Sequence, residues 1–244
     1  MLKEKIERLG QFYVYCSDVH KFGTDAVVLA DFAYPERLIS RTQNMCEFGC
    51  GCGIITMLCC QRNERLNVTA VDIQADAVEL AKSGVEKNKI SDRVNVMCAD
   101  LKSLPIEMNG SFDTVIMNPP YKRVGAGLVT GDERVDIARV ELKCNIDDIC
   151  KSASKLLKFH GRLCICNRPE RLGDTILAMY NAGLTPKRLR LVSQNLQSNV
   201  SLVLIEASKG GSSGMTVEPQ LLIDEEHDRL FKDYFNSEGN ENNE

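Results

Sequence analysis

The chain has 244 residues, of which 43% are hydrophobic and 26% charged, and its formal net charge is −4. A chain of this length can bury a core that needs no disulfide or structural metal, and its overall charge argues against a generic basic surface. The charge is uneven, because residues 224–244 hold eight acidic and two basic residues, which leaves 26 acidic and 28 basic residues, or about +2, elsewhere.

Neither a signal peptide nor a membrane span is expected. The first ten residues are charged and contain no apolar core, and no apolar run approaches the ~20 residues that cross a bilayer. The sequence holds 11 cysteines and 3 histidines, but without the paired spacing of a zinc site. We therefore expect a cytoplasmic protein without a metal, whose thiols are free and mostly buried.

The predicted elements alternate between strands and helices along the chain. We expect strands at 11–16, 44–48, 68–72, 94–98, 112–117, 162–166, 185–192 and 200–207, helices at 25–33, 54–63, 75–88, 133–158 and 169–182, and an extended piece at 215–224. This alternation predicts an α/β fold with a mostly parallel sheet, an antiparallel strand near the C-terminus and helices on both faces. Residues 1–42 are expected to pack as a strand and helix extension on a core of residues 43–223, followed by an acidic, disordered tail at 224–244.

A glycine-rich turn follows the strand at 44–48 and opens the next helix. Glu47 precedes Gly49, Gly51 and Gly53 in the pattern E-x-G-x-G-x-G. Glycines let the backbone turn sharply and approach a ligand closely, while the helix N-terminus offers free N–H groups. The spacing differs from the G-x-G-x-x-G of dinucleotide sites, and the acidic Glu47 favours a cationic ligand over a pyrophosphate.

Two acidic residues follow the next strands in order. Asp72 ends the strand at 68–72, where it can accept both hydroxyls of a ribose, and Asp100 follows the strand at 94–98, where it can accept from an adenine amino group. Together with the glycine turn, these acids resemble the S-adenosylmethionine site of the seven-stranded Rossmann-like methyltransferases. The resemblance implies that both acids and their neighbours Ile73 and Leu101 contact this methyl donor.

A second motif, Asn118-Pro119-Pro120-Tyr121, directly follows the strand at 112–117. The Asn118 side-chain oxygen and the Pro119 carbonyl can accept the hydrogens of a planar NH2 group, and the prolines fix the backbone that carries them. Tyr121 offers a ring on which a planar base can stack. Beside the methyl donor, which Asn118 is also expected to contact, the motif predicts methyl transfer to such a group. N6 of adenine, N4 of cytosine, N2 of guanine and the glutamine side-chain amide stay open.

The resemblance to one bacterial family extends over about residues 8–223. Residues 21–30 resemble the F-x-x-D-A-x-L-L-A element upstream of the glycine turn in that family, and later similar elements lie at 167–172, 186–190 and 209–211. The family is that of the tRNA(Val) (adenine-37-N6)-methyltransferases, in which a Rossmann-like domain methylates N6 of adenosine 37 beside the anticodon.

The family resemblance implies further contacts on both sides of the site. Thr24 and Asp25 would contact the methyl donor. Basic residues would supply the phosphate contacts that RNA binding requires. These are Lys122, Arg123, Arg139, Arg168, Lys187, Arg188 and Arg190.

Other functions remain as alternatives. A glutamine N5-methyltransferase of peptide release factors also uses this motif, but its helical N-terminal substrate domain has no counterpart in the residues before the glycine turn. A guanine-N2 rRNA methyltransferase is a second possibility, and a catalytically silent donor-binding module that interacts with RNA is the non-enzyme alternative. Cys50 and Cys52 lie within the glycine turn, so we expect the donor to protect them from alkylation.

Overall fold

The computed structural model describes residues 5–34, 43–119, 145–226 and 230. It begins with a hairpin of β1 (Lys5–Leu9) and β2 (Phe12–Cys16), which form a separate antiparallel sheet. The hairpin is fastened beside α4 (Ala75–Lys87), because the Tyr13 N–H donates to the Asn88 side chain and Asn88 Nδ2 donates back to the Tyr13 carbonyl, both at 2.8 Å. The sequence predicted β2 but missed β1, whose charged residues do not mark a strand.

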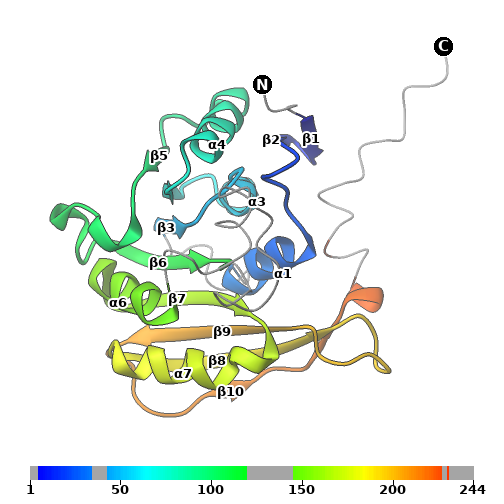
Figure 1. Ribbon diagram of the computed structural model, residues 1–244, viewed down its shortest axis with the longest axis vertical. Helices are drawn as coiled ribbons and strands as arrows, with labels where there is room; N and C mark the ends of the chain where they lie inside the picture. Colours follow the sequence, from blue (N-terminus) through cyan, green and yellow to red (C-terminus); the bar gives the residue numbers. More distant parts are fainter. Residues whose placement is uncertain (1–4, 35–42, 120–144, 227–229, 231–244) are drawn as a thin grey trace, which may run out of the picture.

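A mixed sheet forms the centre of the molecule (Figure 1). Its longer strands are β3 (Asn44–Phe48), β4 (Asn67–Asp72), β5 (Val94–Cys98), β6 (Phe112–Met117), β7 (Leu157–Asn167), β8 (Leu184–Ser193) and β9 (Leu202–Lys209). They lie in the order β5-β4-β3-β6-β7-β9-β8, and β9 runs antiparallel to both of its neighbours. The short β10 (Thr216–Val217) and β11 (Leu221–Leu222) add to β8 in parallel. The predicted α/β sheet with its antiparallel strand is confirmed.

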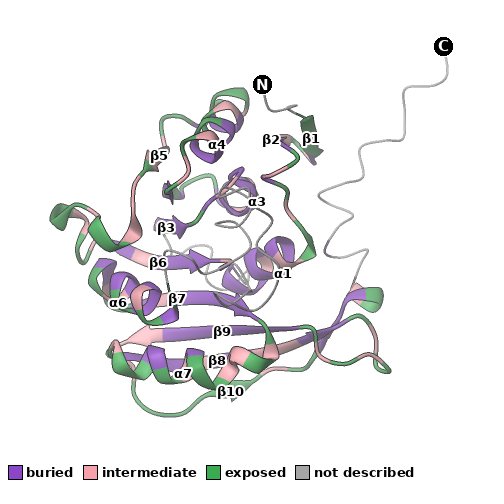
Figure 2. Cartoon of the chain, viewed as in Figure 1, coloured by how far each residue is buried: buried purple, intermediate pink, exposed green. Residues whose placement is uncertain are grey.

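Helices cover both faces of this sheet. On one face, α1 (Thr24–Ala33), α3 (Ile54–Arg62) and α4 share a buried cluster with the strands, and on the other face α6 (Ile146–Leu156) and α7 (Leu172–Asn181) share a second one. Successive strand side chains point to opposite faces, so Met45 of β3 belongs to the first cluster and Cys46 to the second. Figure 2 shows the resulting pattern, with buried residues along the strands and the inner sides of the helices.

One predicted helix, at 133–158, differs from its expected bounds. The structure shows α6, which begins at Ile146 because the Asn145 side chain caps it by accepting from the Asp148 N–H at 2.9 Å, while residues 133–144 lie outside the described residues. The helix ends at Leu156, because the carbonyls of Lys155 and Leu156 accept from the N–H groups of Gly110 and Ser111. The described residues also include the 3-10 helices η1 (Leu101–Ser103), η2 (Ile106–Met108) and η3 (Pro169–Arg171). The tail predicted at 224–244 lies outside the described residues apart from 224–226 and Leu230. Within the described part of the chain, every helix is too short or too polar to cross a membrane.

Candidate active site

Three neighbouring strands bring the two sequence motifs together. In the register of the sheet, Phe48 of β3 lies opposite Met117 of β6 on one side and Val71 of β4 on the other. The glycine turn, Asn118 and Asp72 follow these residues directly, so they leave the sheet side by side at its carboxyl edge. The strand order changes direction between β3 and β6. Ligands of open α/β sheets bind at such a switch point.

The backbone of the glycine turn explains its three glycines. Gly49, Gly51 and Gly53 have φ angles of 62°, 53° and 79°, which residues with side chains rarely adopt. A Cβ at Gly53 would lie 3.2 Å from the Cβ of Ala81 in α4, whereas among the described atoms a Cβ at Gly51 would meet nothing within 4 Å. Gly53 therefore serves the packing of α3 on α4, and Gly51 presents its backbone to an open position that a ligand can approach.

Glu47 is an internal cap for α3. It lies on β3 with 1% of its surface exposed, and its Oε2 accepts from the Thr56 N–H at 2.9 Å and from the Thr56 hydroxyl. The first N–H groups of a helix have no intrahelical partner, and Gly53, which precedes α3, has no side chain to supply one. Burial raises the pKa of Glu47 to about 8, although both bonds from Thr56 lower it. These contacts give Glu47 a structural task, and its contact with the donor stays a prediction.

Asp72 ties the glycine turn to the next helix. Its Oδ2 accepts from the Gly51 N–H at 2.8 Å, and its Oδ1 accepts from the Gln74 N–H at 2.9 Å, just before α4. Burial raises the pKa of this carboxyl group, although the backbone bonds to it act in the opposite direction. The next residue, Ile73, is 40% exposed and offers an apolar side chain at the same edge.

The remaining predicted donor contacts lie at the starts of the helices η1 and α1. Asp100 follows β5, whose Cys98 pairs with Asp72 in the sheet, and its side chain caps η1 by accepting from the Lys102 N–H at 2.9 Å. Leu101, the first residue of η1, is half-buried. Thr24 and Asp25 form the first turn of α1, with Thr24 exposed and Asp25 half-buried. Their contact with a donor also stays a prediction.

Asn118, which directly follows β6, is half-buried, and the next residue, Pro119, is buried. The Cys166 thiol of the neighbouring β7 donates to Asn118 Oδ1 at 3.0 Å. The other expected residues of this region, Pro120, Tyr121, Lys122, Arg123 and Arg139, lie outside the described residues.

Arg188 corrects the prediction of a basic RNA-binding surface. It is only 8% exposed, and its guanidinium donates to Glu206 and Glu218, both at 2.7 Å, while it stacks 4.2 Å from the ring centre of Phe32. Glu206 also pairs with Arg162 at 2.9 Å. Buried charges require such partners, so Arg188 belongs to an internal ion cluster rather than to a phosphate-binding surface.

The other described basic residues differ in how far they are exposed to solvent. Arg190 is largely covered and pairs with Glu218 at 3.0 Å. Lys187 lies half-exposed at a bulge of β8, where its Nζ donates to the Ser212 carbonyl at 3.1 Å. Arg168 is exposed, and it follows β7 at the carboxyl edge, where its guanidinium donates to the Ser201 carbonyl at 3.0 Å. Among the predicted RNA contacts, Arg168 therefore lies nearest in sequence to β7, the strand whose Cys166 contacts Asn118.

Two residues of the site were missed by the sequence analysis. The sequence does not indicate the role of Thr56, because the E-x-G-x-G-x-G motif by itself assigns its partner Glu47 to a ligand. Cys166 is the last residue of a predicted strand, but its position beside Asn118 depends on the β6–β7 register, in which Met117 lies opposite Ile165.

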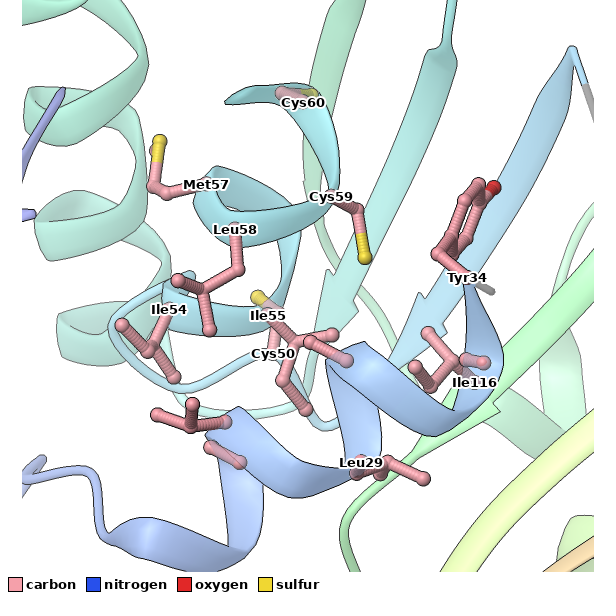
Figure 3. Close-up of a cluster of buried hydrophobic side chains, with 14 of the residues drawn as sticks. Leu29, Tyr34, Cys50, Ile54, Ile55, Met57, Leu58, Cys59, Cys60 and Ile116 are labelled. Atoms are coloured by element: carbon pink, nitrogen blue, oxygen red, sulfur yellow. The ribbon is translucent and has the colours of Figure 1, made fainter. Parts of the chain in front are cut away.

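The cysteines of the glycine turn are not accessible. Cys50 and Cys52 are each 3% exposed, and burial raises the pKa of Cys50 well above its usual range. Figure 3 shows Cys50 between α1 and α3 in an apolar cluster with Leu29 and Ile55. Cys98 is the exposed cysteine among those of the described residues. No group of three or more His, Cys, Asp or Glu side chains in this part of the chain is arranged to hold a metal.

Solved structures share the fold. A predicted O-methyltransferase from Agrobacterium tumefaciens superposes with a TM-score of 0.67 at 21% identity, covering 86% of this chain and 96% of that one. Geranyl diphosphate C-methyltransferase from Streptomyces coelicolor, solved with S-adenosyl-L-homocysteine, superposes with a TM-score of 0.55 at 14% identity, covering 75% and 77%.

Curated relatives are similar over most of the chain. A tRNA1(Val) (adenine(37)-N6)-methyltransferase of Porphyromonas gingivalis is 30% identical over 72% of this chain and 67% of its own length. A protein of the same name from Parabacteroides distasonis is 28% identical over 88% of this chain and 90% of its own length. The profile of the methyltransferase small domain family matches residues 11–179. The chain therefore belongs to the methyltransferase small domain family and is a methyltransferase.

Proposed function

We propose that this chain transfers the methyl group of S-adenosylmethionine to N6 of an adenosine in tRNA, and that the target is adenosine 37 beside the anticodon of valine tRNA. The observation that carries the proposal is the sheet register, in which Phe48 lies opposite Met117 and the donor turn leaves the sheet beside Asn118. The names of the curated relatives support the choice of target.

The residues at the carboxyl edge fit the donor. The open position over Gly51 admits a ligand close to the backbone, and Asp72 stands at the strand end where a ribose would be bound. The exposed Ile73 can cover one face of an adenine ring. When bound, the donor supplies a methyl group on a sulfonium, which is a strong electrophile.

The acceptor side needs alignment more than activation. The amino nitrogen attacks the methyl carbon, the S–C bond breaks as the N–C bond forms, and the nitrogen then loses a proton to water. Because the lone pair of an exocyclic amine is delocalised into its ring, the Asn118 oxygen and the Pro119 carbonyl would hold its hydrogens and direct the nitrogen toward the methyl group. The target base would leave the anticodon loop to reach them.

Phosphate contacts are assigned to the cations that remain accessible. Arg168 lies at the same edge of the sheet as Asn118 and is exposed. A small number of such contacts agrees with a chain whose body carries about +2 outside residues 224–244. Affinity for RNA would then depend strongly on the flipped base and weakly on salt.

The direct test is methylation of bulk tRNA from a strain that lacks the gene. Purified protein is incubated with labelled donor, and the nucleosides are separated by mass spectrometry. N6-methyladenosine in valine tRNA is the expected product. A cytosine or guanine product, or no transfer to tRNA but transfer to a release factor, would replace the proposal by one of the alternatives.

Asn118→Ala tests the assignment of the acceptor residue. Methyl transfer should fall at least ~100-fold, because misplacing the reacting group costs about this much, while calorimetry should still detect donor binding. Asn109→Ala is the matched control, since Asn109 is exposed after η2 and should leave both unchanged. Full activity in Asn118→Ala would refute its role, and binding without any transfer by the wild type would favour the silent module.

A further inference from the structure

The Asn118 side chain is held by a thiol from the next strand. Cys166 is fully buried, and its Sγ donates to Asn118 Oδ1 at 3.0 Å. The contact follows from the register, because Met117 and Ile165 are opposite each other and the residues after them are neighbours. The thiol therefore lies on the protein side of the residue to which the acceptor amine is assigned.

We propose that Cys166 is a positioning residue for methyl transfer, which fixes the orientation of the Asn118 amide. The proposal rests on the proposed function, in which the Asn118 oxygen accepts from the target amine. An amide group presents an oxygen that accepts and a nitrogen that donates, and a half-turn about its last bond exchanges them. An amide oxygen has two lone pairs, so it can accept from a thiol and from an amine at the same time.

The segment that carries Cys166 is rigid enough for this task. The next residue, Asn167, is 1% exposed, and its Nδ2 donates to Thr175 Oγ1 of α7 at 3.2 Å. The Thr175 hydroxyl in turn donates to the Arg171 carbonyl at 2.7 Å, and Asn167 Oδ1 accepts from the Arg168 N–H at 2.9 Å. A catalytic side chain is held best by groups whose own positions are fixed in this way.

The strand also supplies a matched control. Cys164 is two residues earlier on β7, belongs to the same buried cluster and is likewise fully buried. Its Sγ donates to Glu206 Oε2 at 3.9 Å, away from the strand end where Asn118 lies. Cys164→Ala removes the same atom from the same strand, so it reproduces the loss of packing without touching Asn118.

The test compares Cys166→Ala, Cys166→Ser and Cys164→Ala in the full-length protein. For Cys166→Ala we expect kcat to fall about 10-fold to 100-fold, because orientation of a reacting group affects kcat, while the KM for tRNA and the Kd of the donor change less than about twofold. Cys166→Ser keeps a donor and should recover most of the lost kcat. Cys164→Ala should remain within about twofold of the wild type in all three constants.

Several results would overturn the assignment. Unchanged kcat in Cys166→Ala would do so, as would an equal loss in Cys164→Ala or no recovery in Cys166→Ser. If the wild type itself transfers no methyl group to tRNA, the proposed function is refuted independently of the role of Cys166. Infrared spectroscopy then still tests the hydrogen bond between Cys166 and Asn118. The S–H band of Cys166, isolated by subtracting the spectrum of Cys166→Ala, should shift in Asn118→Ala; an unshifted band would refute the hydrogen bond.

Discussion

Replacing Glu47 by glutamine should stabilise the protein at high pH. The wild-type carboxyl group is buried between β3 and α3, and burial raises its pKa from 4.5 to about 8. Glutamine has nearly the same shape, and its side-chain oxygen can accept from both the Thr56 N–H and the Thr56 hydroxyl. It carries no charge at any pH, so the variant avoids the cost of burying a carboxylate.

The sign follows from proton binding. Between pH 4.5 and about 8 the folded protein retains the Glu47 proton more strongly than the unfolded chain does, so the stability of the wild type falls as the pH rises through this window. Below pH 4.5 the buried carboxyl group does not lower the free energy of unfolding, and above about pH 8 the full decrease has been reached. At roughly 1.36 kcal/mol per pKa unit, the whole shift corresponds to an upper bound of about 5 kcal/mol. The free energy of unfolding of Glu47→Gln should exceed that of the wild type by several kcal/mol at pH 8.5 and by little at pH 4.5.

Thermal unfolding followed from pH 4.5 to 8.5 checks this reasoning. In a chain of this size, 1 kcal/mol shifts the Tm by roughly 2–4 °C, so the difference between variant and wild type should grow to about 10 °C. Glu79→Gln is the control, because Glu79 makes an exposed surface pair with Lys82 and its replacement is the same change of a carboxyl group to an amide. A difference for Glu47→Gln that stays constant across the window would refute the buried, proton-retaining carboxyl group.

Three further outcomes are expected. Gly51→Ala should weaken donor binding measured by calorimetry more than it lowers the Tm, whereas Gly53→Ala should lower the Tm more, because only the second places a Cβ against α4. The opposite ranking would contradict the division of roles between the two glycines. Glu206→Ala removes the carboxylate that the buried Arg188 shares with the partly buried Arg162, and it should cost about 3–5 kcal/mol in urea unfolding. A loss below about 1 kcal/mol would show that this cluster is solvated. Among the cysteines of the described residues, a thiol reagent should label Cys98 first, and the donor should slow this labelling at the carboxyl edge, as peptide mass spectrometry can show. An absence of protection would place the donor away from β5.

Much of the fold could be read from local sequence signals. The strand at 44–48 and the helix after its glycine turn were placed within a residue of β3 and α3, because a buried apolar run followed by glycines with positive φ has few alternatives. The end of α6 was misplaced, since it is set by N–H groups from a distant turn at Gly110 and Ser111 rather than by a local stop signal. The hairpin strand β1 was missed for the same reason, as its partner β2 defines it.

The candidate site was predicted in part. The acids and glycines lie at the carboxyl edge of the sheet, as strand order and spacing predict, and their contact with the donor stays a prediction. Their partners could not be found: Thr56 lies nine residues after Glu47, and Cys166 lies 48 residues after Asn118. Arg188 was assigned to RNA because a charged residue on a strand is usually exposed, and its burial between two carboxylates is a property of the assembled sheet.

The sequence by itself determined that residues 224–244 carry the net negative charge and that the remainder is nearly neutral. It also determined the order of the motifs, since glycine turns and strand ends depend on local backbone preferences. Only the tertiary structure decided which charges are internal and which face solvent. Arg162 and Arg188 share Glu206 inside the protein, because strands far apart in the sequence become neighbours in the sheet and buried ions must find partners. The same long-range pairing decided that a cysteine of β7 holds the asparagine of β6.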